Sequence, residues 1–186
     1  MKPQRILDTA AITTISLVAL SRLMPHWPNF TPVMAIALMG GVLFADRLRA
    51  VVVPLAAMLL SDAALGFVFG SEYALHGAQP WVYGSVFAIS IFGHAIRSWR
   101  PASVVLGGGT LAAIGFFIVT NFAVWLSGSM YPLSFSGLGA CYLAGMAFYR
   151  DGGNFLLNGI VSTWLFASVI VMSTSVLRSL VPVNVK

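Results

Sequence analysis

Residues 50–69 read AVVVPLAAMLLSDAALGFVF, an apolar run that contains a single carboxylate, Asp62. A helix needs about 20 mostly apolar residues to cross the hydrocarbon core of a bilayer, which is roughly 30 Å thick. The run therefore predicts a transmembrane helix. The whole chain has the same character, because 59% of its 186 residues are hydrophobic and only 8% are charged. A soluble domain carries about 25% charged residues, so the sequence predicts an all-α integral membrane protein with one domain, residues 1–186.

Other apolar segments resemble this run, and together they predict six transmembrane helices. The expected helices cover residues 6–23, 32–45, 50–69, 81–96, 102–126 and 154–180. The second and fourth are short, which suits helices that are shielded by their neighbours or that end in half-buried loops. A weaker apolar piece, SFSGLGACYLAGMAFY at 134–149, is either an interfacial or re-entrant helix or a seventh crossing.

The basic residues predict the orientation of these helices, because Lys and Arg concentrate in cytoplasmic loops. With six spans and a cytoplasmic N-terminus, only Arg22 and Arg150 lie on the outer side. Seven spans would also place Arg178 and Lys186 outside. Six spans with both termini in the cytoplasm are therefore favoured. The net charge is +5, and the concentration of basic residues in the cytoplasmic loops explains it. The lipid bilayer is therefore an expected partner, and nucleic acid is not.

The absence of several sequence motifs argues against several classes of enzyme. The chain contains no Walker A, GxSxG, HExxH or CxxC motif, so ATP binding by a P-loop, hydrolase, zinc-protease and dithiol chemistry lack support. Its one cysteine, Cys141, rules out an intramolecular disulfide and a multi-cysteine metal site. No enzymatic cofactor is expected.

The loops on the outer side are long and carry polar and aromatic residues. They read RLMPHWPNFTP (22–32), GSEYALHGAQPW (70–81), SGSMYPLSFSG (127–137) and YRDGGN (149–154). The inner loops, ADRLRA and RSWRPA, are short and basic. This asymmetry indicates a site that opens outward, as expected of a binding protein or an importer.

Asp62 is the clearest single candidate for such a site. A carboxylate within a membrane helix costs roughly 2.5–3.5 kcal/mol on the insertion scale, and such residues usually face a cavity or a partner. Asp62 is therefore expected to line or support a binding site. The alternative is a structural carboxylate, satisfied by Ser61, by a backbone donor or by an arginine.

Several outer residues are further candidates. His26 lies between Pro25 and Trp27, where an imidazole can hold a ligand or metal, or simply lie at the membrane interface. Trp27 and Phe30 offer flat apolar faces, although an ordinary aromatic belt would contain the same residues. His76 is a further outer candidate, with weaker support than His26. Arg150 could hold an anionic group or be neutralised by Asp151. Within the membrane, the amide of Asn121 needs a partner, which is either a neighbouring helix or a ligand.

An ordered series of motifs resembles the BtuM-type cobalamin transporters, which are solitary relatives of the substrate-binding S-components of energy-coupling-factor (ECF) transporters. The motifs are PHWPNFTPVMAIALMGG (25–41), VPLAAMLLSDAALGF (53–67), PWVYGSVFAI (80–89), TNFAVWLSGSMYP (120–132) and ACYLAGMAFYRD (140–151). The resemblance covers about Arg22 to Asp151. It implies a six-helix S-component fold in a bacterial inner membrane and cobalamin, or a related corrinoid, as the transported ligand.

The resemblance also implies where the corrinoid would bind. A large flat ligand needs aromatic and apolar walls with a few polar contacts. The expected ligand-binding residues are His26, Trp27, Asn29, Phe30, Asp62, Tyr73, Ala78, Trp81, Tyr83, Asn121, Tyr131 and Arg150. In members of this type a cysteine in the loop before the fourth helix ligates cobalt, but here the matching residue is Ala78 and no cysteine lies between Asp62 and Tyr83. Decyanation is thus not expected, and His26 or His76 would take the axial position.

Other functions remain open at this point. The chain could be an S-component that binds another small molecule and needs a shared ECF energising module, a membrane enzyme that modifies corrinoid or lipid, or a structural subunit without a ligand. Coupled S-components carry an AxxxA pattern on their first helix, whereas the first span here offers only Ala10 and Thr14. This difference favours solitary operation.

Overall fold

The computed structural model describes residues 3–74 and 77–180, and within these ranges the chain forms helices and loops but no strand. The elements in chain order are α1 (Pro3–Leu20), the 3-10 turn η1 (Ser21–Leu23), α2 (Val33–Leu43), α3 (Arg47–Phe69), α4 (Ser71–Ala74), α5 (Gln79–Ala95), α6 (Pro101–Ser103), the π-helical segment η2 (Val104–Gly108), α7 (Gly109–Leu126), α8 (Phe135–Gly145) and α9 (Phe155–Leu180). Each of the six apolar segments expected to be helical is helical, and the prediction of an all-α protein is confirmed.

Four of the helical stretches are long and apolar enough to cross a membrane. They are Gln4–Leu23, Arg47–Phe69, Pro101–Leu126 and Phe155–Leu177. The other two expected spans form shorter helices, α2 with 11 residues and α5 with 17. The four long helices indicate a membrane protein.

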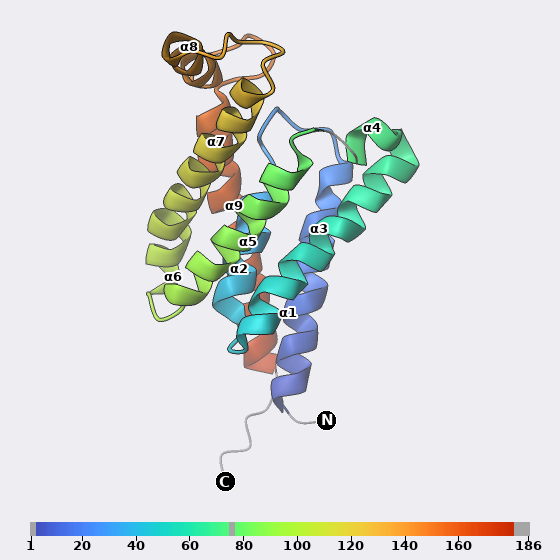
Figure 1. Ribbon diagram of the computed structural model, residues 1–186. Coiled ribbons are helices and arrows are strands. Elements are labelled where there is room, and N and C mark those ends of the chain that lie inside the picture. The colour runs from blue at the N-terminus through green and yellow to red at the C-terminus, as the bar shows by residue number, and fades with distance from the viewer. Residues whose placement is uncertain (1–2, 75–76, 181–186) are drawn as a thin grey trace.

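The short helix α2 occupies the centre of the bundle, where α1, α3, α5, α7 and α9 surround it (Figure 1). Every residue from Val33 to Gly41 is buried. A helix that is apolar on all sides either crosses a membrane or is covered by other elements, and one of 11 residues is too short to cross by itself. The shielding expected for a short second segment is therefore present.

A close contact in the core joins α2 to α5 and depends on glycine. A Cβ atom added to Gly93 of α5 would lie 2.3 Å from the carbonyl oxygen of Leu38 on α2. A Cβ added to Gly41 would lie 2.2 Å from the carbonyl oxygen of Ser90. Only residues without a side chain let the two backbones approach so closely.

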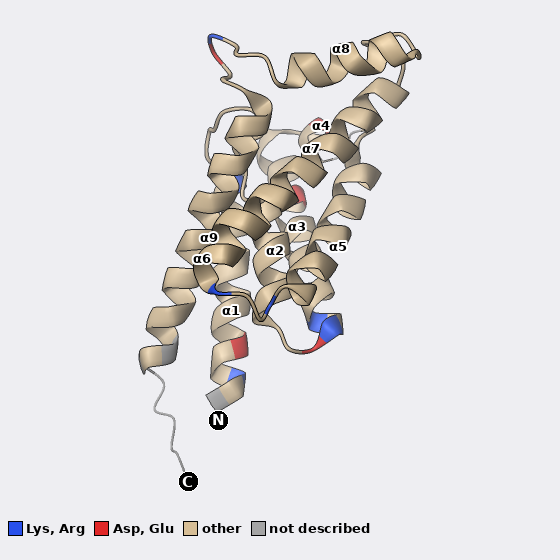
Figure 2. Cartoon of the chain, turned by 90° about the vertical axis from the view of Figure 1, so that its left-hand side faces the viewer, with Lys and Arg blue, Asp and Glu red and all other residues tan. Residues whose placement is uncertain are grey.

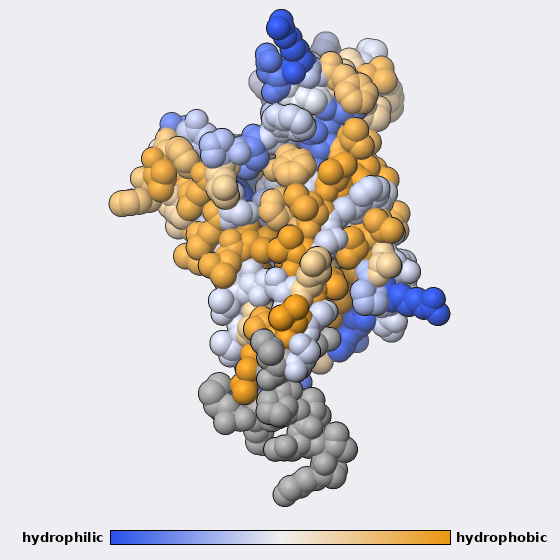
Figure 3. Space-filling model, turned by 180° about the vertical axis from the view of Figure 1, so that it is seen from behind, coloured by the Kyte–Doolittle hydropathy of each residue, from blue (hydrophilic) through white to orange (hydrophobic). Residues whose placement is uncertain are grey.

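The bundle has two ends, which we name after the elements they carry. The α6 end carries α6 and the loop between α2 and α3, and the α8 end carries η1, α4 and α8 (Figure 1). Charged side chains lie mainly towards these two ends (Figure 2), and hydrophobic side chains form a broad band between them (Figure 3). At the α6 end, Arg49 pairs with Asp8 at 2.8 Å and links α3 to α1.

Helix α8 lies across the α8 end of the bundle (Figure 2). It packs on the end of α7, where Tyr142 donates a hydrogen bond to the carbonyl oxygen of Ile118 at 2.9 Å. With 11 residues it is about 16 Å long, at 1.5 Å per residue, and is too short to cross a bilayer.

Candidate functional site

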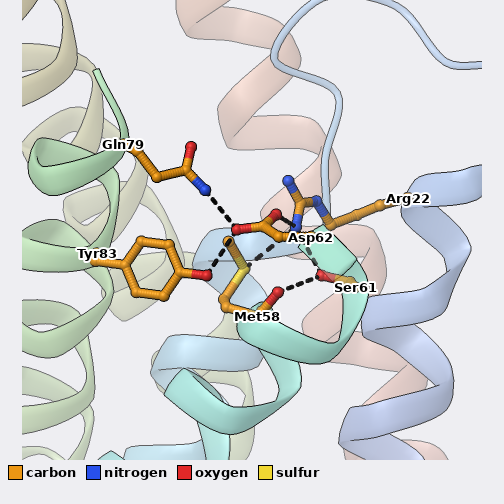
Figure 4. A network of polar contacts seen from close by, with 6 residues as sticks. All are labelled: Arg22, Met58, Ser61, Asp62, Gln79 and Tyr83. Atoms are coloured by element: carbon orange, nitrogen blue, oxygen red, sulfur yellow. Dashed lines mark hydrogen bonds and ion pairs between the residues drawn. The ribbon is translucent and has the colours of Figure 1, made fainter. Parts of the chain in front are cut away.

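A buried polar network surrounds Asp62 near the α8 end (Figure 4). Asp62 is only 5% exposed. Its Oδ1 atom accepts a hydrogen bond from Arg22 Nη1 at 2.5 Å, and its Oδ2 atom accepts from Gln79 Nε2 and from the Tyr83 hydroxyl, both at 2.6 Å. The carboxylate therefore has one cationic and two neutral donors.

Local structure explains how these donors converge. Arg22 lies in the 3-10 turn that ends the first helical stretch, so its side chain reaches α3 from the side. Gln79 and Tyr83 are four residues apart at the start of α5, and residues with this spacing share one face of a helix. Ser61 completes the network, because its hydroxyl accepts from Arg22 Nη1 at 2.6 Å and donates to the carbonyl oxygen of Met58 at 2.9 Å.

The network explains how a carboxylate is tolerated at this depth. A buried ion pair remains stable only when further hydrogen bonds satisfy both partners. Asp62 accepts two such bonds at Oδ2, and Arg22 donates one to the Ser61 hydroxyl. The geometry matches the alternative in which an arginine satisfies Asp62, and it is equally compatible with a role in supporting a binding site.

Two cavities adjoin the network: Arg22 borders one of them and Asp62 borders the other. The Arg22 cavity has a volume of about 420 Å³ and is lined by Arg22, Leu23, Met24, Pro25, His26, Thr31, Leu65, Phe69 and Tyr73. The Asp62 cavity has a volume of about 420 Å³ and is lined by Leu59, Asp62, Ala63, Gly66, Ser71, Ala74, Gln79 and Tyr83. Both volumes fall within the range of small-molecule sites, roughly 300–1,000 Å³.

A third hollow, which we call the Trp27 recess, continues from the Arg22 cavity. It has a volume of about 500 Å³ and is lined by Pro25, His26, Trp27 and Phe30. Pro25 and His26 belong to both hollows. The Trp27 side chain is 63% exposed, and Phe30 packs edge-on against Phe166 of α9. The flat aromatic faces expected at the outer mouth therefore border an open recess.

The structure brings together half of the residues expected to bind a ligand. His26, Trp27, Phe30, Asp62, Tyr73 and Tyr83 line one or more of these three hollows. Trp81 is two residues from Tyr83 in the sequence but packs edge-on against Phe122 of α7. Ala78 precedes the first residue of α5 and lines none of the three hollows.

The other expected residues have different surroundings. Asn29 has a positive φ of 60°, and its carbonyl oxygen lies 3.5 Å from Ser162 Oγ. The amide of Asn121 donates to the carbonyl oxygen of Phe117 within its own helix, at 2.9 Å. Tyr131 lies in the loop between α7 and α8 and lines none of the three hollows.

The remaining candidates concern charge and metal binding. Arg150 is exposed and, within residues 3–74 and 77–180, makes no ion pair with Asp151 or any other residue. His76 lies outside the described residues. Among the described residues, no three His, Cys, Asp or Glu side chains form a group that could hold a metal ion. An axial cobalt ligand requires only one imidazole, and His26 is placed in the Arg22 cavity and the Trp27 recess.

Sequence reasoning missed two members of the network, Arg22 and Gln79. A signal for Arg22 exists in the sequence, because it is one of only two basic residues on the expected outer side and a cation is one of the partners that can satisfy a carboxylate within a span. Gln79 carries no comparable signal, since a glutamine at the start of a helix is usually exposed to solvent.

Comparisons with known proteins identify a family but not an activity. No curated protein and no solved structure matches the chain. A family model described as a family of unknown function matches residues 3–183, nearly the whole chain. The chain therefore belongs to DUF6580, a family of unknown function.

Proposed function

We propose that this protein binds a small organic molecule near one face of the bacterial inner membrane and takes part in its uptake. The observation that carries the proposal is the buried ion pair between Asp62 and Arg22, in which each partner borders a cavity. Ligand sites typically combine apolar walls with a few fixed polar groups, as these cavities do. An intramembrane ionisable group is by itself a functional candidate.

In the proposed topology six helices cross the membrane, both termini are cytoplasmic and the cavities open outward. The distribution of charge supports this orientation. Arg47, Arg49, Arg97 and Arg100 all lie in or beside the short loops at the α6 end, away from the cavities. Because basic residues concentrate on the cytoplasmic side, this distribution supports a cytoplasmic α6 end.

Cobalamin or a related corrinoid is the ligand that we propose first, and the proposal comes from the resemblance to BtuM-type transporters and their S-component-like bundle. Two features support it. The Trp27 recess offers exposed aromatic faces on which a flat macrocycle can stack. The His26 ring lines the same recess and is a suitable axial ligand for cobalt.

A smaller vitamin-like molecule is a second candidate, and the cavity volumes favour it. No one of the three hollows exceeds about 500 Å³, and a corrinoid would have to occupy adjoining hollows together. In this case the protein would act as an S-component for another ligand and would require an ECF energising module. Modification of the corrinoid is not proposed, since the cobalt-binding cysteine of the resembling family is replaced by Ala78.

The decisive experiment is to purify the protein from cells supplied with cyanocobalamin and record its visible spectrum, followed by calorimetric titration. We expect a coloured preparation and binding at micromolar concentration. Trp27→Ala should weaken binding, whereas Phe67→Ala should not, because Phe67 is 93% exposed on α3 and lines none of the three hollows. Folded protein that stays colourless and gives no binding heat would refute corrinoid binding.

Uptake itself is tested separately by growth. A strain deficient in cobalamin uptake should be rescued by this chain alone if it acts as a solitary importer. Rescue that requires co-expression of ECF coupling proteins would instead identify an S-component that depends on a partner.

A further inference from the structure

The Arg22 guanidinium has donors that the Asp62 network does not use. Nη1 makes the contacts with Asp62 and Ser61 and lies 3.8 Å from the Met58 sulfur. A guanidinium carries five N–H donors, and only two of them belong to Nη1. Within the part of the chain that the structure describes, Nε and Nη2 donate no hydrogen bond to any residue. Figure 4 shows the other terminal nitrogen pointing away from Asp62.

The unused donors belong to the residue that borders the Arg22 cavity. Three other polar side chains, those of His26, Thr31 and Tyr73, line this cavity together with apolar Leu65 and Phe69. The Arg22 side chain is only 15% exposed. A cation that is largely removed from water interacts more strongly with an opposite charge than one at the surface does. The cavity therefore combines a guanidinium that has unused donors with polar side chains able to hydrogen-bond an anion.

We propose that the Arg22 cavity binds a phosphate group. The planar fork of a guanidinium matches phosphate oxygens in a two-point contact, and the edge formed by Nε and Nη2 supplies such a fork. Two sources could deliver the phosphate: the phosphodiester of cobalamin, a source that rests on the function proposed above, or the head group of a phospholipid at the α8 end of the bundle.

Asp62 fixes the sign of the expected effects. It orients Arg22, but its negative charge opposes a second anion on the same guanidinium. Gln79 and Tyr83 donate to its Oδ2 atom and so share part of that charge. Replacing Asp62 with Asn keeps a hydrogen-bonding side chain and removes the opposing charge, so phosphate should bind more tightly. Replacing Arg22 with Lys keeps a cation beside Asp62 but removes the free fork, so phosphate should bind more weakly.

The two variants separate this proposal from a purely structural ion pair. If the pair only held the fold together, both variants would weaken binding. We expect opposite changes, each of about tenfold, as is usual for hydrogen bonds to charged groups. The melting temperature of each variant in detergent shows whether it is folded. If Asp62→Asn does not fold, Arg22→Lys still tests the proposal through the ratio of its affinities for a ligand with and without a phosphate, because loss of a purely structural pair would weaken both equally.

The experiment uses two corrinoids and one lipid with the full chain in lipid-free dodecyl maltoside. Cyanocobalamin contains the phosphodiester and dicyanocobinamide does not, and calorimetry measures the affinity for each. Phosphatidylglycerol binding is measured on the same protein by native mass spectrometry. We expect cyanocobalamin to bind at least tenfold more tightly than dicyanocobinamide, with the difference lost in Arg22→Lys and increased in Asp62→Asn.

Each other outcome has a defined meaning. If neither corrinoid binds but phosphatidylglycerol binds and Arg22→Lys weakens it, the phosphate site stands with a lipid as its source, and the corrinoid function is refuted. If both corrinoids bind equally and Arg22→Lys changes neither corrinoid nor lipid binding, the phosphate site is refuted and the corrinoid function stands. If none of the three probes binds, both proposals are refuted.

Discussion

The Nη1 atom of Arg22 lies 2.5 Å from Oδ1 of Asp62, and this ion pair joins positions 40 residues apart in the chain. Both side chains are largely buried, with exposures of 15% and 7%. Removing one partner of a buried pair leaves an uncompensated charge and typically costs about 3–5 kcal/mol. We expect Arg22→Met to lower the free energy of unfolding by about this amount, measured by denaturant titration in detergent.

The charge, rather than the loss of packing, should cause this destabilisation. The double variant Arg22→Met/Asp62→Leu contains no buried charge, and replacing a buried pair by apolar residues is often nearly neutral. It should therefore be more stable than Arg22→Met alone. The surface pair Arg49–Asp8 is the matched control, because Arg49 is 58% exposed, and Asp8→Asn should cost no more than about 1 kcal/mol. A double variant less stable than Arg22→Met would contradict this account.

The contact between α2 and α5 gives a second prediction. A Cβ atom at Gly93 would lie 2.3 Å from the Leu38 carbonyl oxygen, and a backbone atom cannot move aside as a flexible side chain can. Overpacking of a core usually costs about 1–3 kcal/mol. Gly93→Ala should lower the melting temperature measurably in detergent.

Gly84 supplies the control on the same helix. A Cβ atom there would have no neighbour within 4 Å among the described residues. Because alanine favours helices by up to about 1 kcal/mol over glycine, Gly84→Ala should leave stability unchanged or raise it slightly. Equal destabilisation by the two substitutions would show that the close approach of the helices is not what Gly93 provides.

The proposed orientation predicts which end of the bundle a membrane-impermeant maleimide reaches in intact cells. Ser129→Cys lies in an exposed loop at the α8 end, and Arg100→Cys lies in an exposed loop at the α6 end. The native Cys141 is buried, and burial raises the pKa of its thiol, so background labelling should be low. We expect Ser129→Cys to be labelled at once and Arg100→Cys only after the cells are lysed. The reverse order would refute the orientation.

The helical segments could be predicted from the sequence because hydrophobicity is a local property of the chain. The expected span 50–69 lies within α3, and 32–45 closely matches α2. The burial of α2 was also foreseeable, since an apolar helix of this length is too short to cross a bilayer and is usually shielded by other helices. The predicted end of the first span, residue 23, agrees with the helical stretch Gln4–Leu23, but hydrophobicity does not distinguish the 3-10 turn at Ser21–Leu23 from a continuing α-helix.

The partners of Asp62 could not be predicted from the sequence. A carboxylate in a membrane span shows that a partner is needed, but the choice between a ligand, a backbone donor and a distant cation depends on how the helices pack. Arg22 and Gln79 come from different elements and meet Asp62 only in the folded bundle. The Arg22 cavity has the same origin, since it is lined by residues 22–31 and 65–73, which are distant in the sequence.

The exposed apolar side chains of α8 lead to the last prediction. Phe135 is 95% exposed and Leu143 is 67% exposed, so contact with water would be costly. A helix that lies across the end of a transmembrane bundle should instead bury this face at the boundary between head groups and acyl chains. A nitroxide attached at Phe135→Cys in a Cys141→Ser background should therefore collide more often with oxygen than with a water-soluble nickel complex in vesicles. The same label at Ser129→Cys should show the opposite preference. If both positions favoured the nickel complex equally, α8 would lie in water, and its apolar face would need another partner.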